Sequence, residues 1–231
     1  ADRTLAQAEE VSHAQGMALG WAWRARILLV LGRIDDAAHA IRAASAHLGP
    51  QTNWEDKAFV VSVQTRIHFA TELSDATLSL VDELETLFKA MQRLGWLVEV
   101  RAWRIVALTR LGRRGEAEPR LDALKSATGW PQVTIRADLA LGEAQRTLGR
   151  VDAARESLSR ALEHSEANGY RYLQLEAHRA LVHVVEDATA RARHQRVAAG
   201  LAKSLAANLP RDEAERFLAH HDPDGSDPLA R

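Results

Sequence analysis

The stretch WRARILLVLGR, from Trp23 to Arg33, returns in nearly the same form as WRIVALTRLGR, from Trp103 to Arg113. The two copies begin 80 residues apart, at positions 23 and 103. A third Leu-Gly-Arg stands at residues 148–150, with its glycine 37 residues after the previous one. Because 80 is about twice 40, the chain has an internal period of about 37–41 residues, and we expect a degraded copy near residue 72.

Each period carries two stretches in which apolar side chains recur every three or four residues, as they do in amphipathic helices. In the first copy, the first stretch contains Trp21, Ala25, Leu28 and Leu31. Gly32 is expected to end this helix, because glycine adopts the left-handed C-cap conformation without steric cost. Asp35 and Asp36 then begin the next helix, where acidic side chains can cap free backbone amides. Its apolar face comprises Ala37, Ile41, Ala44 and Leu48, and Gly49-Pro50 ends it.

The same pair of helical stretches continues along the chain and predicts about a dozen helices between residues 1 and 221. No stretch alternates polar and apolar residues for long enough to indicate a sheet, so we expect an all-α fold. A single amphipathic helix pair cannot bury its own apolar face, and neighbouring pairs are therefore expected to stack. Residues 222–231 contain turn residues without periodicity and are expected to be a disordered tail or a linker. The first residues already follow a helical pattern, which favours a fragment of a larger protein.

The composition is that of an ordinary soluble chain, and it argues against several classes of function. Lys and Arg total 30 and Asp and Glu 31, so the net charge of −1 lacks the basic excess of most nucleic-acid-binding domains. No window of roughly 18 uncharged apolar residues indicates a membrane span, and no signal peptide opens the chain. The absence of cysteine excludes disulfides and thiol catalysis and agrees with a reducing compartment. We therefore expect a cytoplasmic protein.

None of the chemically reactive residues falls into a pattern that predicts catalysis or metal binding. His178 and His183 are five residues apart, which turns them toward different faces of a helix. The adjacent His220 and His221 also point in different directions. The chain lacks a glycine-rich phosphate loop and the Gly-x-Ser-x-Gly motif of serine hydrolases. Acidic pairs such as Glu9-Glu10 lie at helix starts or on exposed faces. We expect no enzyme activity, no cofactor and no metal site.

The repeated unit resembles the tetratricopeptide repeat. It consists of a helix, a glycine turn and a second helix that begins with acidic residues. The first complete copy matches that family's pattern at Trp21, Ala25, Leu28, Ala37, Ile41, Ala44 and Pro50. A later copy matches it at Leu141, Gly142, Ala154, Leu158 and Ala161. The period exceeds the family's usual value of about 34 residues, and this longer spacing is similar to arrays in large bacterial signalling proteins. Those include LuxR-type regulators of the maltose-activator kind, kinases, nucleotide cyclases and CHAT proteases. The resemblance implies a right-handed superhelical α-solenoid of antiparallel helix pairs over residues 1–221.

The resemblance also implies where a partner binds, since the first helices of successive tetratricopeptide repeats line the concave surface. By their place in the pattern, the residues expected at this binding groove are Arg26, Thr65, His68, Val106, Arg110, Arg136, Glu143 and Arg146. Arginines at several of these positions favour a partner that presents carboxylates. Trp23 and Trp103 occupy equivalent positions nine residues before Gly32 and Gly112, and they either pack between repeats or anchor a ligand.

These features together favour a non-catalytic module that binds a protein or peptide and scaffolds or regulates an attached signalling domain. The partner would be a separate protein, a peptide or another domain of the same parent chain, with no role for nucleic acid or membrane. The alternative is a small-molecule-sensing domain of a bacterial ATP-dependent transcriptional regulator, which the tryptophan-rich first half of the chain supports. The sequence leaves the oligomeric state open.

Overall fold

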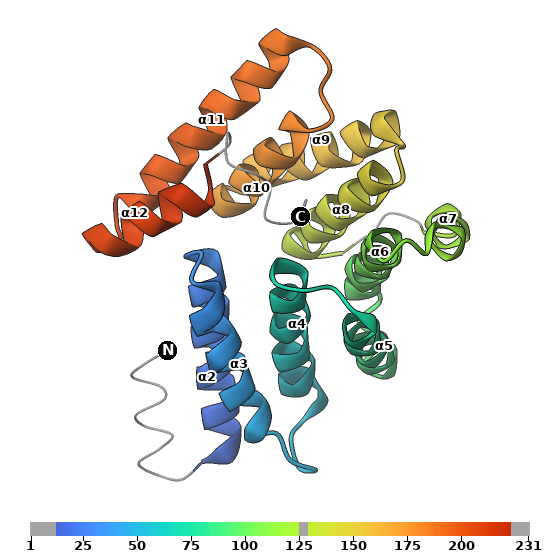
Figure 1. Cartoon of the computed structure of the whole chain (residues 1–231), viewed down its shortest axis with the longest axis vertical. Coiled ribbons are helices and arrows are strands. Elements are labelled where there is room, and N and C mark those ends of the chain that lie inside the picture. The colour runs from blue at the N-terminus through green and yellow to red at the C-terminus, as the bar shows by residue number, and fades with distance from the viewer. Residues whose placement is uncertain (1–12, 125–128, 223–231) are drawn as a thin grey trace. The chain divides into compact units, whose positions relative to one another are not determined.

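The computed structural model describes residues 13–124 and 129–222, in which the chain forms 11 α-helices and no strand (Figure 1). The helices are α2 (Ala14–Val30), α3 (Ile34–Ala46), α4 (Trp54–Ala70), α5 (Asp75–Ala90), α6 (Leu94–Arg110), α7 (Arg114–Asp122), α8 (Pro131–Thr147), α9 (Val151–Ala167), α10 (Arg171–Val182), α11 (Ala188–Ala206) and α12 (Arg211–His220). The all-helical fold predicted from the sequence is confirmed. The expected tail lies, except for Asp222, outside the described residues.

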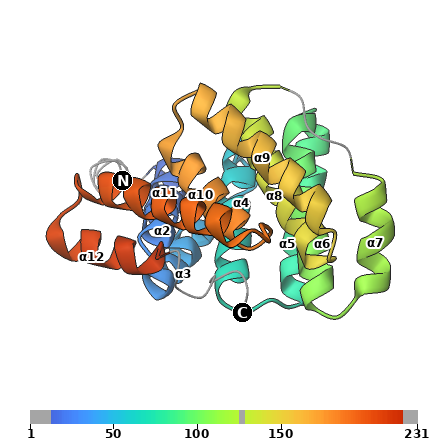
Figure 2. The same ribbon diagram turned by 90° about the horizontal axis from the view of Figure 1, so that it is seen from above.

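The chain divides into two compact units. Unit 1 comprises residues 1–92 with α2 to α5, and unit 2 comprises residues 93–231 with α6 to α12. Within each unit, the helices with extensive contacts are one or two elements apart along the chain. Figure 2 shows this for α8 and α9 in unit 2, which lie side by side along much of their length. Packing of neighbouring helices is thus the main source of structure in both units.

The repeated Leu-Gly-Arg ends the preceding helix in the same way each time. At the end of α6, Gly112 has a φ of 76°, and the N–H of Arg113 donates to the carbonyl of Leu108 at 2.8 Å. The N–H of Gly112 makes the second hydrogen bond of this Schellman C-cap at 3.1 Å. Gly32 and Gly149 have the same conformation, with φ angles of 75° and 74°. The predicted glycine C-caps are confirmed, and they account for the repeated Leu-Gly-Arg.

The following helix begins with an ion pair rather than with the expected side-chain caps. Asp35 and Asp36 lie in the first turn of α3, but no side chain makes a cap hydrogen bond there. Asp36 Oδ2 instead accepts from Arg33 Nε at 2.7 Å, and Glu116 Oε1 accepts from Arg113 Nε at 2.6 Å in α7. In both helices the carboxylate binds the arginine side chain instead of a backbone N–H group. The carboxylate still lies near the positive end of the helix dipole. The capping role predicted for the two aspartates is therefore wrong, although their place at the helix start is right.

The degraded copy expected near residue 72 is the turn between α4 and α5. Helix α4 ends at Ala70 and α5 begins at Asp75, so the break falls where the period places it, but without a glycine. The N–H of Ser74 donates to Thr77 Oγ1 at 3.2 Å, which satisfies one backbone group at the start of α5. Polar turn residues thus replace the glycine in this copy.

Small side chains form much of the core of unit 1 where α2, α3 and α4 meet. This core consists of Ala22, Ala25, Leu28, Ala37, Ala40, Ile41, Ala44, Val60, Val63 and Ile67, all buried. Trp21 packs against it from the edge and is partly buried. Because alanine extends little from a helix, these positions let the helix axes approach closely. The predicted apolar faces of the first helix pair are confirmed, with Leu48 at the margin rather than in the centre.

In unit 2, α8 and α9 approach each other closely at Gly142. A methyl group at this position would lie 2.6 Å from Leu158 Cγ and 3.3 Å from the carbonyl oxygen of Ala154. The neighbouring core joins α9 to α10 and the residues after it, through Ala154, Leu158, Leu181 and Val184. No helix in the described part of the chain is both long and apolar enough to cross a bilayer.

Candidate functional site

Three of the residues predicted for the binding groove come together in unit 2. Arg146 and Glu143 lie one turn apart on α8, where Arg146 Nε and Nη2 each donate to the carboxylate at 2.7 Å. Arg110, in the last turn of α6, approaches the same carboxylate, with its Nη2 3.4 Å from Glu143 Oε1. We call these three residues the arginine cluster.

The arginine cluster is partly buried and brings two arginines to one carboxylate. Its side chains are between 14% and 22% exposed, and two guanidinium groups share one carboxylate. The Nη1 atom of Arg110 is buried and has no hydrogen-bond partner among the described residues. A buried donor without an acceptor is costly. Arg110 therefore offers a charged donor suited to a further acceptor, such as a carboxylate from outside the chain.

The packing of α6 on α8 brings the arginine cluster together, because its members come from different helices. The period predicts this meeting, since Arg110 and Arg146 occupy nearly equivalent places before the glycines of successive Leu-Gly-Arg copies. Arg136 lies seven residues before Glu143 on α8 and is partly buried. Two helical turns place it on the same face as the cluster, one step toward the start of α8.

Two of the residues predicted for the groove belong to the core instead. Thr65 is fully buried, and its Oγ1 donates to the carbonyl of Val61 at 2.8 Å. Val106 is only 4% exposed. Each shares a helix face with a predicted groove residue that is only partly buried, His68 or Arg110, but lies one turn deeper in the core. Neither residue can contact a partner directly in this structure, and we remove both from the candidate site.

His68 and Thr77 link α4 to α5 within unit 1. His68 Nδ1 lies 3.3 Å from Thr77 Oγ1, and burial lowers the pKa of the imidazole below its ordinary value. His68 is therefore predominantly neutral near pH 7 and adds no charge to this part of unit 1. It remains a predicted binding residue that already has a contact within the fold.

An aromatic surface on α2 and α4 contains two further predicted residues. Trp23 is 47% exposed, and its ring centroid lies 4.6 Å from that of Phe59. The Arg26 guanidinium lies 5.2 Å from the Trp23 centroid, within the range of a cation–π interaction. Trp23 thus packs against α4 with one part of its ring and stays open to solvent with another. Trp103, at the equivalent place in the repeat, is partly buried.

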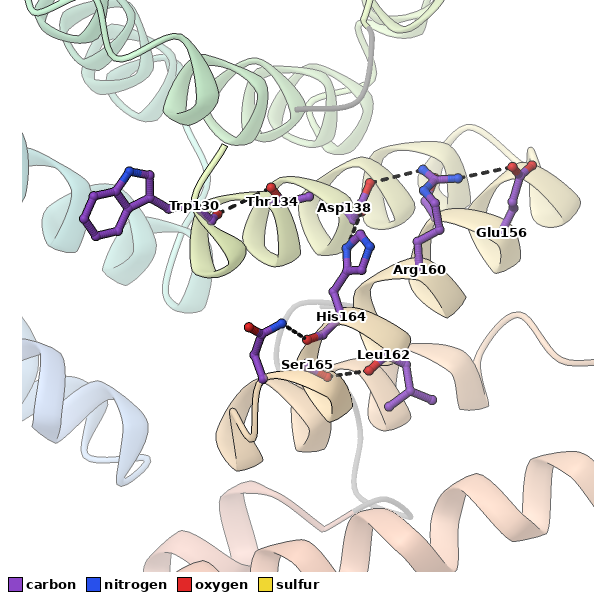
Figure 3. Close-up of polar contacts among 10 residues, drawn as sticks. Trp130, Thr134, Asp138, Glu156, Arg160, Leu162, His164 and Ser165 are labelled. Atoms are coloured by element: carbon purple, nitrogen blue, oxygen red, sulfur yellow. Dashed lines mark hydrogen bonds and ion pairs between the residues drawn. The ribbon is translucent and has the colours of Figure 1, made fainter. Parts of the chain in front are cut away.

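Sequence reasoning missed a buried acidic residue between α8 and α9, which Figure 3 shows in detail. The side chain of Asp138 is only 2% exposed, and its Oδ1 accepts from Arg160 Nη2 at 3.1 Å. His164 Nδ1 is 4.0 Å from the other carboxylate oxygen, and Arg160 also contacts Glu156 at 3.2 Å. Burial raises the pKa of Asp138 above its ordinary value, although the hydrogen bond and charge of Arg160 act in the opposite direction.

The network around Asp138 is best described as a structural ion pair. Both charges have partners within the fold, and the acid sits between two packed helices. The signal in the sequence is an aspartate within an otherwise small and apolar stretch of α8, ADLALG. The spacing of residues along the chain does not reveal that a residue 22 positions away supplies the compensating charge.

No group of three or more His, Asp or Glu side chains among the described residues is arranged to hold a metal ion. No protein-family model, curated protein or solved structure matches this chain.

Proposed function

We propose that this chain is a non-catalytic recognition module of the tetratricopeptide kind, which binds a carboxylate-bearing peptide or protein segment. In this proposal, the helix pairs form a right-handed α-solenoid, and the first helices of the pairs line its binding side. The segment belongs to a separate protein or to another domain of the same parent chain. Binding would scaffold or regulate a signalling domain attached to the module.

Two features of the fold support the solenoid. Within each unit, helices pack mainly against elements one or two places away along the chain, as they do in linear repeat arrays. The same Schellman turn ends α2, α6 and α8, so the chain leaves each of these helices toward the next one with the same backbone geometry. Each of these features is what a duplicated helix pair produces when it stacks on its neighbour.

The arginine cluster carries the proposal for carboxylate binding. Two guanidinium groups contact the one carboxylate of Glu143, and Arg110 Nη1 has no acceptor among the described residues. Because the cluster is mostly shielded from water, a carboxylate that reached it would form charge-assisted hydrogen bonds at low cost in side-chain entropy. The cluster is also on α6 and α8, which are both first helices in the proposed stack.

The decisive experiment measures binding of acidic peptides to matched arginine variants. Short random peptides displayed on phage are selected on the folded chain, and the recovered sequences are synthesised together with versions in which Glu and Asp become Gln and Asn. Binding to wild type, Arg110→Gln and Arg146→Gln is then measured by calorimetry. Arg211→Gln is the control, because Arg211 is exposed on α12 and pairs only with Glu215 among the contacts that are resolved.

We expect the acidic peptides to lose about tenfold or more in affinity with either cluster variant, since a hydrogen bond between charged groups contributes about 1.5–3 kcal/mol. Binding should also weaken as salt increases. The control variant should bind like wild type. Equal affinity for acidic and amidated peptides, or for wild type and Arg110→Gln, would show that the cluster is not the binding site.

The aromatic surface on unit 1 favours a second candidate function, the sensing of a small molecule. Trp23 offers a half-exposed ring beside Arg26 and Phe59, an arrangement suited to stacking against a flat or sugar-like ligand. A thermal-shift screen with sugars and nucleosides tests it, with Trp23→Phe as the matched variant. A ligand that stabilises wild type by several degrees and not the variant supports this function. The absence of any stabilisation across the screen would argue against it.

A further inference from the structure

A pair of histidines connects two helices near the end of unit 2. His178 lies on α10 and His194 on α11, and their Nδ1 atoms are 2.8 Å apart. The ring centroids are 5.1 Å apart, and the rings are tilted by 47°. His178 is buried at 7% exposure. Sequence spacing compared His178 with His183 on its own helix, whereas its actual partner follows 16 residues later on the next helix.

This contact depends on the protonation state of both rings. A hydrogen bond between two imidazole nitrogens needs one nitrogen that carries a proton and one that offers a lone pair. At neutral pH, one uncharged ring can donate from Nδ1 while the other accepts. When both rings are charged, both Nδ1 atoms carry protons, and two positive rings lie 5.1 Å apart. Protonation of both rings therefore replaces an attraction between α10 and α11 by a repulsion.

The surroundings of the pair favour the uncharged rings. Burial, followed by the charges of His194 and Arg193, lowers the pKa of His178 to about 4. The pKa of His194 is lowered as well, first by burial and then by Arg193. Arg193 lies on α11 beside His194, so the charge that acts on the pair from this side is also positive.

The other helices packed near α10 do not supply a compensating negative charge to the pair among their described contacts. On α8 and α9, Asp138 is bound to Arg160. Next to α12, Arg179 of α10 lies 3.1 Å from Nδ1 of the buried His221. Burial and the charge of Arg179 lower the pKa of His220 too, so α12 responds to acid in the same direction as α11.

We propose that the His178–His194 contact is a pH-sensitive joint that holds α11, and α12 after it, against α10 at neutral pH and lets them open locally in acid.

The direction and size of the effect follow from proton linkage. In the closed state His178 takes up a proton only near pH 4, whereas in an open, solvated state it does so near its ordinary value of 6.5. Between these values the open state binds more protons, so the stability of the closed state is complete above about pH 6.5 and is lost as the pH falls toward 4. At about pH 5 the opening equilibrium is expected to be roughly 30-fold larger than at about pH 7.5.

Hydrogen exchange measured by mass spectrometry tests the joint on the intact chain. After correction for intrinsic exchange rates, peptides from α11 should lose roughly 30-fold in protection between about pH 7.5 and about pH 5. Peptides from α2 and α3 serve as the internal reference and should change by much less. If protection of α11 follows that of the reference helices across this range, the proposal is wrong.

Two variants separate the joint from a general loss of stability in acid. In the double variant His178→Asn/His194→Asn, the side chains keep a hydrogen-bonding atom near the Nδ1 positions but cannot be charged. Its α11 peptides should lose less than about threefold in protection over the same pH range. The control His183→Asn removes an exposed histidine at the end of α10 and should behave like wild type. A full acid response in the double variant would overturn the proposal.

A direct titration keeps the proposal testable even if the double variant does not fold. The imidazole resonances of wild type, assigned by single histidine substitutions, report the pKa of each ring by nuclear magnetic resonance. We expect the resonance of His178 to titrate below about pH 5, together with line broadening in α11 over the same range. Titration of both rings near 6.5, without any change in α11, would contradict a joint at this place.

Discussion

Replacing Gly112 with alanine is expected to lower the free energy of unfolding of unit 2 by about 1–2 kcal/mol, because of backbone conformation alone. Gly112 has a φ of 76°, and a methyl group built at its Cα meets no atom within 4 Å. The substitution therefore causes no steric clash with neighbouring residues. What it adds is the cost of holding an L-residue in the left-handed region, since Cβ approaches the following carbonyl oxygen there.

A matched substitution isolates that cost. Gly200 lies within α11, and a methyl group there also meets nothing within 4 Å, but its backbone is helical. Gly200→Ala should stabilise the chain by about 0.5–1 kcal/mol, because alanine loses less conformational entropy than glycine on entering a helix. Gly112→Asn should fall between wild type and Gly112→Ala, since asparagine tolerates the left-handed conformation better than alanine. The three variants thus have a predicted order of stability as well as predicted magnitudes.

Urea unfolding followed by far-ultraviolet circular dichroism measures these differences through the transition midpoint and the slope. A loss of 1–2 kcal/mol corresponds to roughly 2–8 °C in melting temperature for a chain of this size, so thermal melts provide a second measurement. If Gly112→Ala is as stable as wild type while Gly200→Ala is stabilised as expected, the Schellman turn does not impose the left-handed conformation in solution. Our explanation of the repeated Leu-Gly-Arg would then be refuted.

Three further predictions concern the packing of α8 on α9, the buried acid and the arrangement of the helix pairs. Gly142→Ala should destabilise unit 2 by about 1–3 kcal/mol in urea unfolding, because its methyl group would lie 2.6 Å from Leu158 Cγ, and a neutral effect would contradict this close approach. Since the pKa of Asp138 is raised, the folded state holds this proton more tightly than the unfolded state, and its stabilising effect is present in acid and lost as the pH rises. The stability of wild type relative to Asp138→Asn should therefore fall as the pH rises above about 4, and a flat or rising difference would refute the raised pKa. If the helix pairs form an extended solenoid, X-ray scattering should give a radius of gyration clearly above the roughly 17 Å of a compact chain of this length, whereas a value near 17 Å would exclude it.

The helices and their ends could be predicted because the signals that specify them are local. Apolar spacing placed the buried faces of the first pair, and Gly32 and Gly112 adopt the φ angles that their C-cap role requires. The break between α4 and α5 was predicted from the period alone, although polar residues form it instead of glycine. The same local reasoning was wrong for the aspartates at the start of α3, because an arginine three residues earlier was the better partner for the carboxylate.

The candidate site could be predicted only in part, for a related reason. Arg110, Glu143 and Arg146 were expected on one surface and do meet, because the period relates equivalent positions on successive helix pairs. Thr65 and Val106 were expected on the same surface and are buried, although His68 and Arg110, one turn later on the same helix faces, are only partly buried. A repeat pattern thus predicts which helices meet better than it predicts how deeply each residue along a helix face is buried.

By itself, the sequence determined that the chain is all-helical, where each helix pair turns and which apolar faces must be covered, since these depend on residues a few positions apart. Only the tertiary structure decided that Asp138 is compensated by Arg160, that His178 meets His194, and that Arg110 has a buried donor without an acceptor among the described residues. The first two are contacts between residues on different helices, and the third depends on which atoms of neighbouring helices surround Arg110. All three are set by the rotation and separation of the packed helices. Spacing along the chain does not specify either quantity.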